Sequence, residues 1–455
     1  MYIDPMTRYS GRERRKLRVG YVLYQLVGHL LTPILILVLF LRSRKEPLYG
    51  ENLGHRFGFM AAKNTGSVFV FAASLGETRA AAPVLRRLLD RGETILLTHS
   101  SASGLAEGRR AFNTEIEAGT VVQGYVPTDL FWALSMFYTR HKPKLGLVVE
   151  AELWPGLLME ARRKNIPMFQ INGNYTQRGF ERDQRLSGGF RLLFWRLYQM
   201  VLTKSKERAE RYSAAGFPSD HIKLVGELKF DLAIKEDQTK KAESLLQAAP
   251  PHGPVFEIVS SVEDEEDKLI YVLKSLRGSL SPCPHVVWVP RSPQRFEAVA
   301  DRLRQEGFTV AQRSACLDDD FQIKDGDLWP DVLVGDSIGE MDFYYSLADI
   351  VFVGGTLNAS GGHNIIEPLA LQKPVVTGAS IHAILYPAIE AMDAGAMQKF
   401  DSEKELALFL VKTLNNVEKM KEFRDKTLGF NSQHIGAADR SIEEIALYLD
   451  NPNEP

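Results

Sequence analysis

Short apolar runs alternate with amphipathic segments along most of this chain. The runs are rich in β-branched residues, and polar residues follow most of them. Helical periodicity over about ten to fifteen residues separates one run from the next, which predicts βα units and parallel sheets buried on both faces. The predicted strands cover residues 67–73, 94–98, 121–126, 145–149, 168–171 and 200–203, and then 255–260, 286–290, 332–334, 350–353 and 375–376.

The alternation lapses once, and this interruption predicts a domain boundary. A charged helical segment there leads into Ala-Pro-Pro-His-Gly-Pro at residues 249–254. A chain of 455 residues is also too long for one hydrophobic core. We therefore expect an α/β protein with two facing doubly wound domains and a cleft between them. The predicted segments are 1–45 as basic flank and membrane anchor, 46–235 as the first Rossmann-like domain, 236–253 as linker, and 254–455 as the second domain with the C-terminal helices.

The charge is distributed unevenly along the chain. The first 45 residues hold nine Lys or Arg and two Asp or Glu, a net charge of +7, whereas the other 46 basic and 55 acidic residues carry −9. A basic end on an acidic body favours attraction to anionic lipid headgroups and argues against general nucleic-acid binding. The two cysteines, Cys283 and Cys316, fit a reducing compartment and give no disulfide framework.

Between its basic flanks, the N-terminal segment carries an uncharged, mostly apolar run at residues 19–41. As a helix this run spans about 34 Å, enough for a bilayer core. Gln25, His29 and Pro33 interrupt it, so a helix lying in the membrane interface fits the pattern as well as one that spans the bilayer. No small-x-small cleavage site follows, which disfavours a signal peptide.

A glycine-rich stretch follows the predicted strand 350–353. Gly354-Gly355 ends the strand, and Gly361-Gly362 precedes His363, Asn364 and a helical segment that carries Glu367. Glycines let a backbone approach a ligand closely, a helix start offers N–H groups to phosphate, and a carboxylate about one turn further on can hold a ribose diol. The pattern indicates a nucleotide-sugar site, although an ordinary strand-loop-helix corner is the alternative.

Acidic residues follow two other predicted strands. Glu77 comes after Gly76 at a strand-to-helix turn, where it can be a general base or simply an acid that complements the helix dipole. Glu150 and Glu152 follow the strand 145–149; they can orient an acceptor, hold a metal, or cap the next helix. Because the chain has no Cys/His ligand cluster, we predict no catalytic metal.

Arginines and further polar residues follow two strands of the second series. Arg291 and Arg295 come after 286–290, and the planar guanidinium suits phosphate or carboxylate, with a solvated surface as the alternative. Residues 336–340, Asp-Ser-Ile-Gly-Glu, bring acidic and small residues to the same sheet edge.

Together these residues resemble the 3-deoxy-D-manno-octulosonic acid (Kdo) transferases of lipopolysaccharide biosynthesis, over residues 53–378. The family motif S-x-G-E matches residues 74–77, and E-x-E-L-W-P matches 150–155. L-K-F-D matches 228–231, and G-D-T/S-x-G-E matches 335–340. The most specific match is F-V-G-G-S/T with G-G-H-N-x-x-E-P, found at 352–356 and 361–368.

The resemblance implies a GT-B fold, an inverting, metal-independent transfer from CMP-Kdo to a lipid A precursor without a cofactor, and an N-terminal anchor at the cytoplasmic face of the inner membrane. It makes Glu77 the catalytic base and places Glu367 on the ribose. The residues implied for donor binding are Arg291, Gly339, Glu340, Gly361, Gly362, His363, Asn364 and Glu367; those implied for the acceptor or for structure are Ser74, Gly76, Glu150, Glu152 and Lys229.

Three segments depart from the family pattern. P-R-H is Pro290-Arg291-Ser292 here, S-T-H-x-G-E is Ser-Val-Glu-Asp-Glu-Glu at 261–266, and N-A-R-x-S is Asn-Gly-Asn-Tyr-Thr at 172–176. Glu263 thus replaces a histidine, and it would repel a phosphate unless its loop turns away. The alternatives are another CMP-activated acidic sugar or acceptor, or a non-catalytic membrane-bound paralogue.

Overall fold

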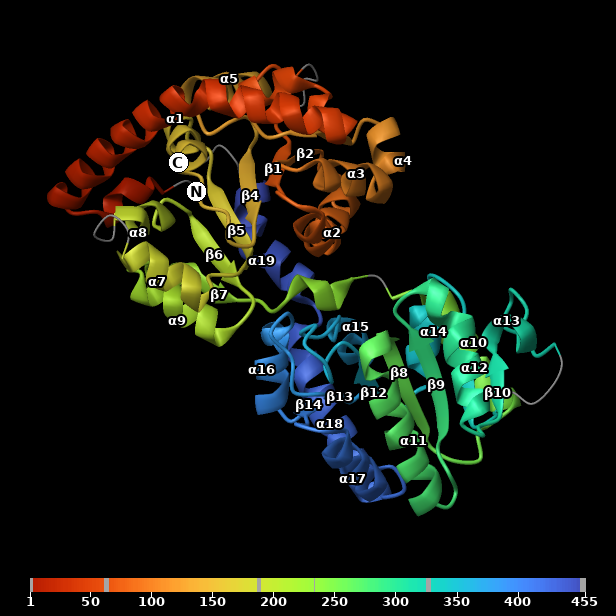
Figure 1. The fold of residues 1–455 in the computed structure, drawn as a ribbon. Helices are drawn as coiled ribbons and strands as arrows, with labels where there is room; N and C mark the ends of the chain where they lie inside the picture. Colours follow the sequence, from red (N-terminus) through yellow and green to blue (C-terminus); the bar gives the residue numbers. More distant parts are fainter. Residues whose placement is uncertain (1–2, 61–64, 186–189, 233, 325–328, 451–455) are drawn as a thin grey trace. The chain divides into compact units, whose positions relative to one another are not determined.

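The computed structural model describes residues 3–60, 65–185, 190–232, 234–324 and 329–450. The chain forms two compact units: the first unit is Met1–Leu232 with His434–Pro455, and the second unit is Ala233–Gln433. Each unit is built on a parallel sheet of seven strands, with helices on both faces (Figure 1). The predicted α/β class is therefore confirmed.

The sheet of the first unit has the strand order β3-β2-β1-β4-β5-β6-β7. Chain order reverses where β1 pairs with both β2 and β4 (Val68 opposite Ile95 and Leu145), which is where doubly wound sheets bind ligands. Its strands are β1 (Val68–Phe71), β2 (Ile95–His99), β3 (Val121–Tyr125), β4 (Leu145–Val149), β5 (Met168–Gly173), β6 (Met200–Thr203) and β7 (Ile222–Leu224).

The helices of the first unit divide between the two faces of this sheet. Phe69 and Phe71 point into a core shared with α5, α6 and α8, and Val68 and Val70 into a second core shared with α2, α3 and α19. The helices are α1 (Gly11–Lys45), α2 (Leu75–Asp90), α3 (Ala102–Ala111), α4 (Asn113–Glu117), α5 (Phe131–His141), α6 (Pro155–Arg163), α7 (Gln177–Arg185), α8 (Phe190–Trp195), α9 (Lys206–Ala214) and α19 (Ala437–Asp450).

The last helix corrects the predicted domain division, which gave residues 254–455 to the second domain. Ala438, Ile442, Ile445 and Leu449 of α19 are buried in the core that holds Val68 and Val70. Asp231 fixes the start of the helix by accepting hydrogen bonds from the backbone N–H groups of residues 436 and 438, at 2.7 Å each. Burial of this apolar face places α19 in the first unit.

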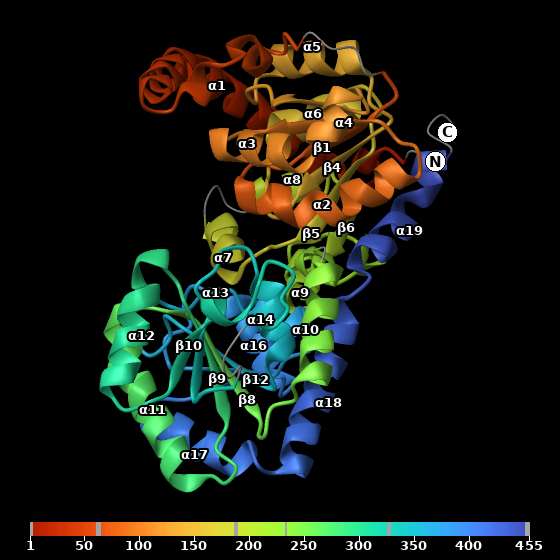
Figure 2. The same ribbon diagram turned by 90° about the vertical axis from the view of Figure 1, so that its right-hand side faces the viewer.

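Helix α1 lies lengthwise along the first unit, as Figure 1 shows from the side and Figure 2 nearly end-on. Leu17 is fully buried in the core of the unit. Gln25 is also buried: its Nε2 donates to the carbonyl of Asp129 at 2.9 Å, and its Oε1 accepts from the backbone N–H of Phe131 at 2.9 Å. The glutamine that interrupts the apolar sequence therefore fastens α1 to the body of the protein.

The sheet of the second unit has the order β10-β11-β9-β8-β12-β13-β14, with its reversal between β8 and β12. Helices α11 and α12 lie on one side of it, and α10 and α14 on the other (Figure 2). Its strands are β8 (Val255–Ser261), β9 (His285–Pro290), β10 (Val310–Gln312), β11 (Val332–Val334), β12 (Ile350–Val353), β13 (Val375–Thr377) and β14 (Met397–Lys399). Its helices are α10 (Glu236–Ala248), α11 (Glu266–Ser279), α12 (Phe296–Gln305), α13 (Arg313–Cys316), α14 (Met341–Leu347), α15 (Ile366–Ala370), α16 (Leu385–Asp393), α17 (Glu403–Thr413) and α18 (Val417–His434).

The segment predicted as a linker, residues 236–253, is mostly helix α10 and is part of the second unit. Gln238 Nε2 donates to the Gly339 carbonyl at 2.9 Å, and the backbone N–H of Lys235 donates to Asp342 Oδ2 at 2.9 Å. These bonds join the start of α10 to the loop before α14 and to the first turn of α14. The units divide between Leu232 and Ala233, and again between Gln433 and His434.

Candidate functional site

Glu77 occupies the first turn of α2, directly beyond the carboxyl end of β1. Ser74 caps the helix by accepting a hydrogen bond from the Glu77 N–H at 3.3 Å, and Glu77 Oε2 accepts one from the Ala73 N–H at 2.5 Å. Burial, with the neighbouring Glu152 and Glu150 carboxylates, raises the pKa of Glu77 to about 7. A carboxylate that titrates near neutral pH is suited to take up a proton. Gly76 is exposed beside it.

Glu150 and Glu152 follow β4, the neighbour of β1 in the sheet. Glu150 has a left-handed backbone (φ +58°), which turns the chain sharply at the strand end. Glu152 accepts a hydrogen bond from Trp154 Nε1 at 2.6 Å, but burial still raises its pKa. The structure thus brings three predicted carboxylates, those of Glu77, Glu150 and Glu152, to the adjoining ends of two strands.

Two lysines balance these acids from the ends of β6 and β7. Lys204 is buried, with its Nζ 2.9 Å from Glu227 Oε2 and 3.9 Å from Glu150 Oε1. The predicted Lys229 also places its Nζ 3.9 Å from Glu150 Oε1. Burial acts to raise the pKa of Glu227, but Lys204 and Lys229 outweigh it and the net pKa is lowered.

Lys204 and Glu227 were not predicted from the sequence. Asn172, from the segment that departs from the family pattern, joins them by donating from Nδ2 to Glu227 Oε1 at 2.9 Å. Lys204 directly follows β6, Asn172 is the penultimate residue of β5, and Glu227 lies three residues beyond β7. Nearness to the carboxyl end of a strand was the available signal. Together with the predicted residues they form a continuous polar edge on the first sheet.

In the second unit, the glycine loop after β12 is held by Glu265, which the sequence did not single out. Its Oε1 accepts from the N–H of Gly355 at 2.7 Å and of Val262 at 3.1 Å, and its Oε2 accepts from the Leu357 N–H at 3.3 Å. A Cβ on Gly354 would overlap the backbone carbonyl oxygen of Ser260 and lie 2.6 Å from Glu265 Oε1, so glycine is required there. Part of the divergent acidic segment therefore shapes the loop.

The second glycine pair allows a sharp reversal of the chain. Gly361 and Gly362 both have φ near +91°, and a Cβ on Gly361 would come 2.6 Å from the ring of His382. The reversal brings His363 back to the first pair, where a Cβ on Gly355 would meet its Nε2 at 3.0 Å. This Nε2 is buried and has no hydrogen-bond partner among the residues that the structure describes. Burial, and next Arg291, lowers the pKa of His363.

Asn364 and Glu367 belong to the start of the short helix α15. Asn364 Oδ1 accepts from the Ile366 N–H at 2.9 Å, while its side chain is exposed. Glu367 is the second residue of the helix rather than a full turn inside it, because α15 begins only at Ile366. Its exposed side chain hydrogen-bonds with Tyr345, whose pKa is raised chiefly by burial and further by Glu367.

The remaining predicted donor residues have contrasting surroundings. Arg291 is exposed beyond β9, and its backbone N–H donates to the Ser261 carbonyl at 3.0 Å. Glu340 forms an ion pair with the buried Arg313, whose Nε lies 2.8 Å from Glu340 Oε2. Gly339 (φ +83°) shapes the same loop. Glu340 and Gly339 therefore brace the loop before α14.

The acid at position 263 pairs with an arginine instead of facing a phosphate. Arg295 places Nη1 3.1 Å from Glu263 Oε1 and Nη2 2.6 Å from Glu266 Oε2. The charge that replaces the family histidine is thus balanced locally. Within the described ranges, no group of three or more His, Cys, Asp or Glu is arranged to hold a metal ion.

Comparison with known proteins gives consistent results. Residues 51–232 match the family model described as 3-deoxy-D-manno-octulosonic-acid transferase (kdotransferase). A 3-deoxy-D-manno-octulosonic acid transferase of Bordetella pertussis is 32% identical over 440 residues, covering 95% of this chain and 100% of that protein. The Haemophilus influenzae protein of the same name is 29% identical, covering 92% and 96%.

Solved structures share the fold. A UDP-GlcNAc 2-epimerase from Neisseria meningitidis superposes with a TM-score of 0.55 at 14% identity, covering 84% of this chain and 99% of that one. A glycosyltransferase from Rickettsia africae gives a TM-score of 0.51 at 12% identity, covering 86% and 100%. At such identities the likeness concerns the fold alone, and it agrees with the predicted GT-B class.

Proposed function

Since the chain belongs to the 3-deoxy-D-manno-octulosonic acid (Kdo) transferase family, and is therefore a glycosyltransferase, we propose that it transfers Kdo from CMP-Kdo to a lipid A precursor. The observation that carries this proposal is the Glu77 carboxyl group, half-buried at the end of β1 with its pKa raised to about 7. An enzyme that activates a sugar hydroxyl at neutral pH needs a base of this strength.

The reaction follows from that group. Glu77 takes the proton from an acceptor hydroxyl, and the oxygen forms a bond to the anomeric carbon of Kdo. The bond from that carbon to the phosphate oxygen of CMP breaks on the opposite side, so the anomeric configuration inverts and CMP leaves as an anion. Glu150 and Glu152 keep the pKa of Glu77 high. Lys204 and Lys229, each with its Nζ 3.9 Å from Glu150 Oε1, partly neutralise the negative charge of this edge.

The donor is assigned to the second unit. The glycine loop can bring its backbone close to a nucleotide. His363 Nε2, which has no hydrogen-bond partner among the residues described, bonds a group of the donor. Arg291, exposed and able to influence His363, supplies the positive charge for the phosphate. Glu367 holds the ribose, with Tyr345 fixing its carboxylate. Glu340 and Gly339 act indirectly by bracing the loop before α14.

Helix α1 gives weak support for membrane association. Within the described residues it is the one helix long and apolar enough to cross a bilayer, with a mean hydropathy of 2.1 and only 11% of the apolar window buried. Exposed apolar side chains line it, including Leu26, Leu30 and Ile34. We assign it to the cytoplasmic face of the inner membrane, where its basic flanks meet anionic headgroups.

The contacts of α1 favour an orientation in the plane of the membrane. Polar contacts with the body extend from Glu13, paired with Arg196 at 2.7 Å, to Gln25, and His29 still packs against Phe131 at 5.5 Å between ring centroids. The uncharged residues beyond, 30–41, span about 18 Å as a helix, less than the bilayer core of about 30 Å. With α1 docked, the helix can lie in the interface but cannot cross.

The transfer is tested with full-length protein, CMP-Kdo and a tetraacylated lipid A precursor, and the lipid product is weighed by mass spectrometry. We expect a mass increase of one or more Kdo residues, and no increase with Glu77→Gln. A product formed only with another CMP-activated acidic sugar would reassign the donor. Tight CMP-Kdo binding without any product would instead show a non-catalytic paralogue.

The membrane orientation has its own test. Leu26→Lys and Leu30→Lys, at positions 56% and 78% exposed, should reduce flotation with anionic vesicles without lowering thermal stability. Leu408→Lys, at an exposed position of the second unit (55%), is the matched control. A protease site placed after residue 10 should be cleaved from the same side of sealed vesicles as the body. Protection of that site would show a spanning helix.

A further inference from the structure

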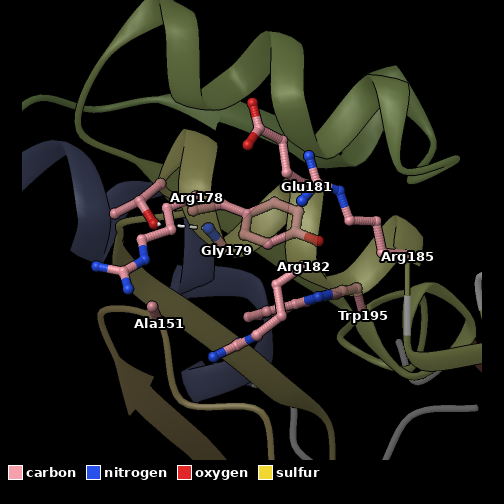
Figure 3. A pocket seen from close by; sticks show the side chains of 9 residues that line it. Ala151, Arg178, Gly179, Glu181, Arg182, Arg185 and Trp195 are labelled. Atoms are coloured by element: carbon pink, nitrogen blue, oxygen red, sulfur yellow. Dashed lines mark hydrogen bonds between the residues drawn. The ribbon is translucent and has the colours of Figure 1, made fainter. Parts of the chain in front are cut away.

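A pocket of about 740 Å³ opens in the first unit beside the polar edge of the first sheet. Helix α7, the segment before it and α8 line the pocket, together with Ala151 from the turn after β4 (Figure 3). Ala151 stands between Glu150 and Glu152 in the chain, so the pocket adjoins the carboxylates that surround the proposed base. Its lining residues are Ala151, Tyr175, Thr176, Arg178, Gly179, Glu181, Arg182, Arg185 and Trp195.

The three arginines form a stripe on one face of α7. They are spaced at i, i+4 and i+7, which places them one above another on a helix. In Figure 3, Arg178 and Arg182 extend toward the side of the pocket where Ala151 lies, whereas Arg185 extends toward Glu181. All three side chains are exposed to solvent.

Asp183 fixes α7 from its opposite face. This buried carboxylate accepts hydrogen bonds from Tyr175 OH and Trp195 Nε1 at 3.1 Å each, and from Arg191 Nε at 2.9 Å. These bonds hold the helix against the aromatic core, and they hold the arginine stripe toward the pocket. The stripe is therefore positioned by the fold and does not depend on its own contacts.

The arginines have little to neutralise them. Among the described residues, the one ion pair of Arg182 is a 3.4 Å contact with Asp183, which already accepts hydrogen bonds from three closer donors. Arg178 and Arg185 form no ion pair within the part of the chain that the structure describes. Glu181 is the one acid among the lining residues, so the pocket carries a net charge of about +2. An exposed stripe of arginines also occurs on solvated helices, but here it lines a pocket next to the polar edge of the first sheet.

We propose that this pocket binds a phosphate monoester of the acceptor glycolipid, with Arg178 and Arg182 as its principal ligands. A phosphate monoester carries a charge of about −1.5 to −2 at neutral pH, which matches the pocket better than a single carboxylate. The guanidinium fork bonds phosphate oxygens in pairs. The volume admits a sugar phosphate. The proposal rests on the proposed function, because it names the group by which the acceptor is held while its hydroxyl meets Glu77.

The test compares two acceptors: the phosphorylated lipid A precursor and the same lipid after its phosphates are removed. In the double variant Arg178→Gln/Arg182→Gln, KM for the phosphorylated lipid should rise about tenfold or more, with kcat nearly unchanged. KM for the dephosphorylated lipid should not change. The variant Arg178→Lys/Arg182→Lys should recover part of the loss. Arg110→Gln, at an arginine 68% exposed elsewhere in the first unit, should behave as the wild type.

Binding of both lipids in detergent micelles is measured separately, so that the pocket is tested even without turnover. A wild type that prefers the phosphorylated lipid but transfers nothing would refute the proposed function and retain the pocket. An equal loss with both lipids, or a rise in KM for CMP-Kdo alone, would overturn the pocket. The double variant should float with anionic vesicles as the wild type does; lost flotation would make the stripe a membrane contact instead.

Discussion

Replacing Glu77 by glutamine links the chemistry of the site to the stability of the first unit. Glutamine keeps the shape of the side chain and can still accept the hydrogen bond from the Ala73 N–H, but it can neither take up a proton nor carry charge. Turnover should fall by about 10²–10⁴-fold, the usual contribution of a general base. CMP-Kdo binding should change little, because the base acts on the acceptor.

The same substitution should stabilise the protein at high pH. An unfolded glutamate titrates near pH 4.3, whereas burial beside Glu152 and Glu150 raises the pKa of folded Glu77 to about 7. The folded state therefore holds this proton more tightly. Its contribution to stability is complete below about pH 4 and is lost as the pH rises through about 7. The difference between the two pKa values corresponds to at most about 4 kcal/mol, and partial exposure reduces our expectation to about 1–2 kcal/mol.

Denaturant titrations of the wild type and Glu77→Gln at pH 4 and pH 8.5 measure this difference. The free energies of unfolding should agree at pH 4, and that of the variant should be higher at pH 8.5. Glu210→Gln, at an exposed carboxylate of α9, is the control and should show no such divergence. If the free energies of unfolding of the wild type and Glu77→Gln changed in parallel with pH, the raised pKa of Glu77 would be refuted. Wild-type turnover in the variant would reduce Glu77 to a helix-terminus acid.

Three further predictions concern the donor loop and the buried lysine. Glu367→Ala should weaken CMP binding about ten- to a hundredfold in calorimetric titration, since a charge-assisted hydrogen bond is lost, while the melting temperature is kept; the opposite pattern would make Glu367 a helix brace. Glu265→Gln keeps one carbonyl acceptor and loses the second, so CMP affinity should fall and hydrogen exchange of the Gly355 amide should become faster. Unchanged exchange would contradict the role of Glu265 in holding the glycine loop. Lys204→Met leaves Glu227 buried without its closest cation and should cost about 3–5 kcal/mol of stability in denaturant titration. The double variant Lys204→Met/Glu227→Gln should partly restore that stability. No loss in the single variant would show that the pair is not coupled.

The sequence alone determined the central strands and the residues at their ends. β1, β4, β8 and β12 are buried on both faces, and their apolar runs mark them clearly, although Glu257 interrupts the run of β8. The chain direction of a parallel sheet then brings the polar residues that follow to one edge. That rule places Glu77, Glu150 and Glu152 at one edge, but their adjacency follows from the pairing of β1 with β4, which only the structure shows. The motifs were equally local, because each lies within one strand-to-helix turn.

Of the four edge strands that the described residues form, β3 was predicted, and the other three were missed for the converse reason. β7, β10 and β14 have three residues each and are partly exposed, so they carry no apolar run that could mark them. An edge strand pairs on one side only, and its hydrogen bonds rather than its side chains define it.

Tertiary structure also decided what each amphipathic face and each buried polar group contacts. The sequence of α19 shows an apolar face but not the sheet that buries it. Gln25 interrupts the apolar sequence of α1, and only the structure shows that it forms two hydrogen bonds to the body of the first unit. Glu265 and Lys204 are charged residues that a sequence pattern assigns to the surface. Their burial depends on partners about 90 and 23 residues away, Gly355 and Glu227, and only folding brings such groups into hydrogen-bond distance.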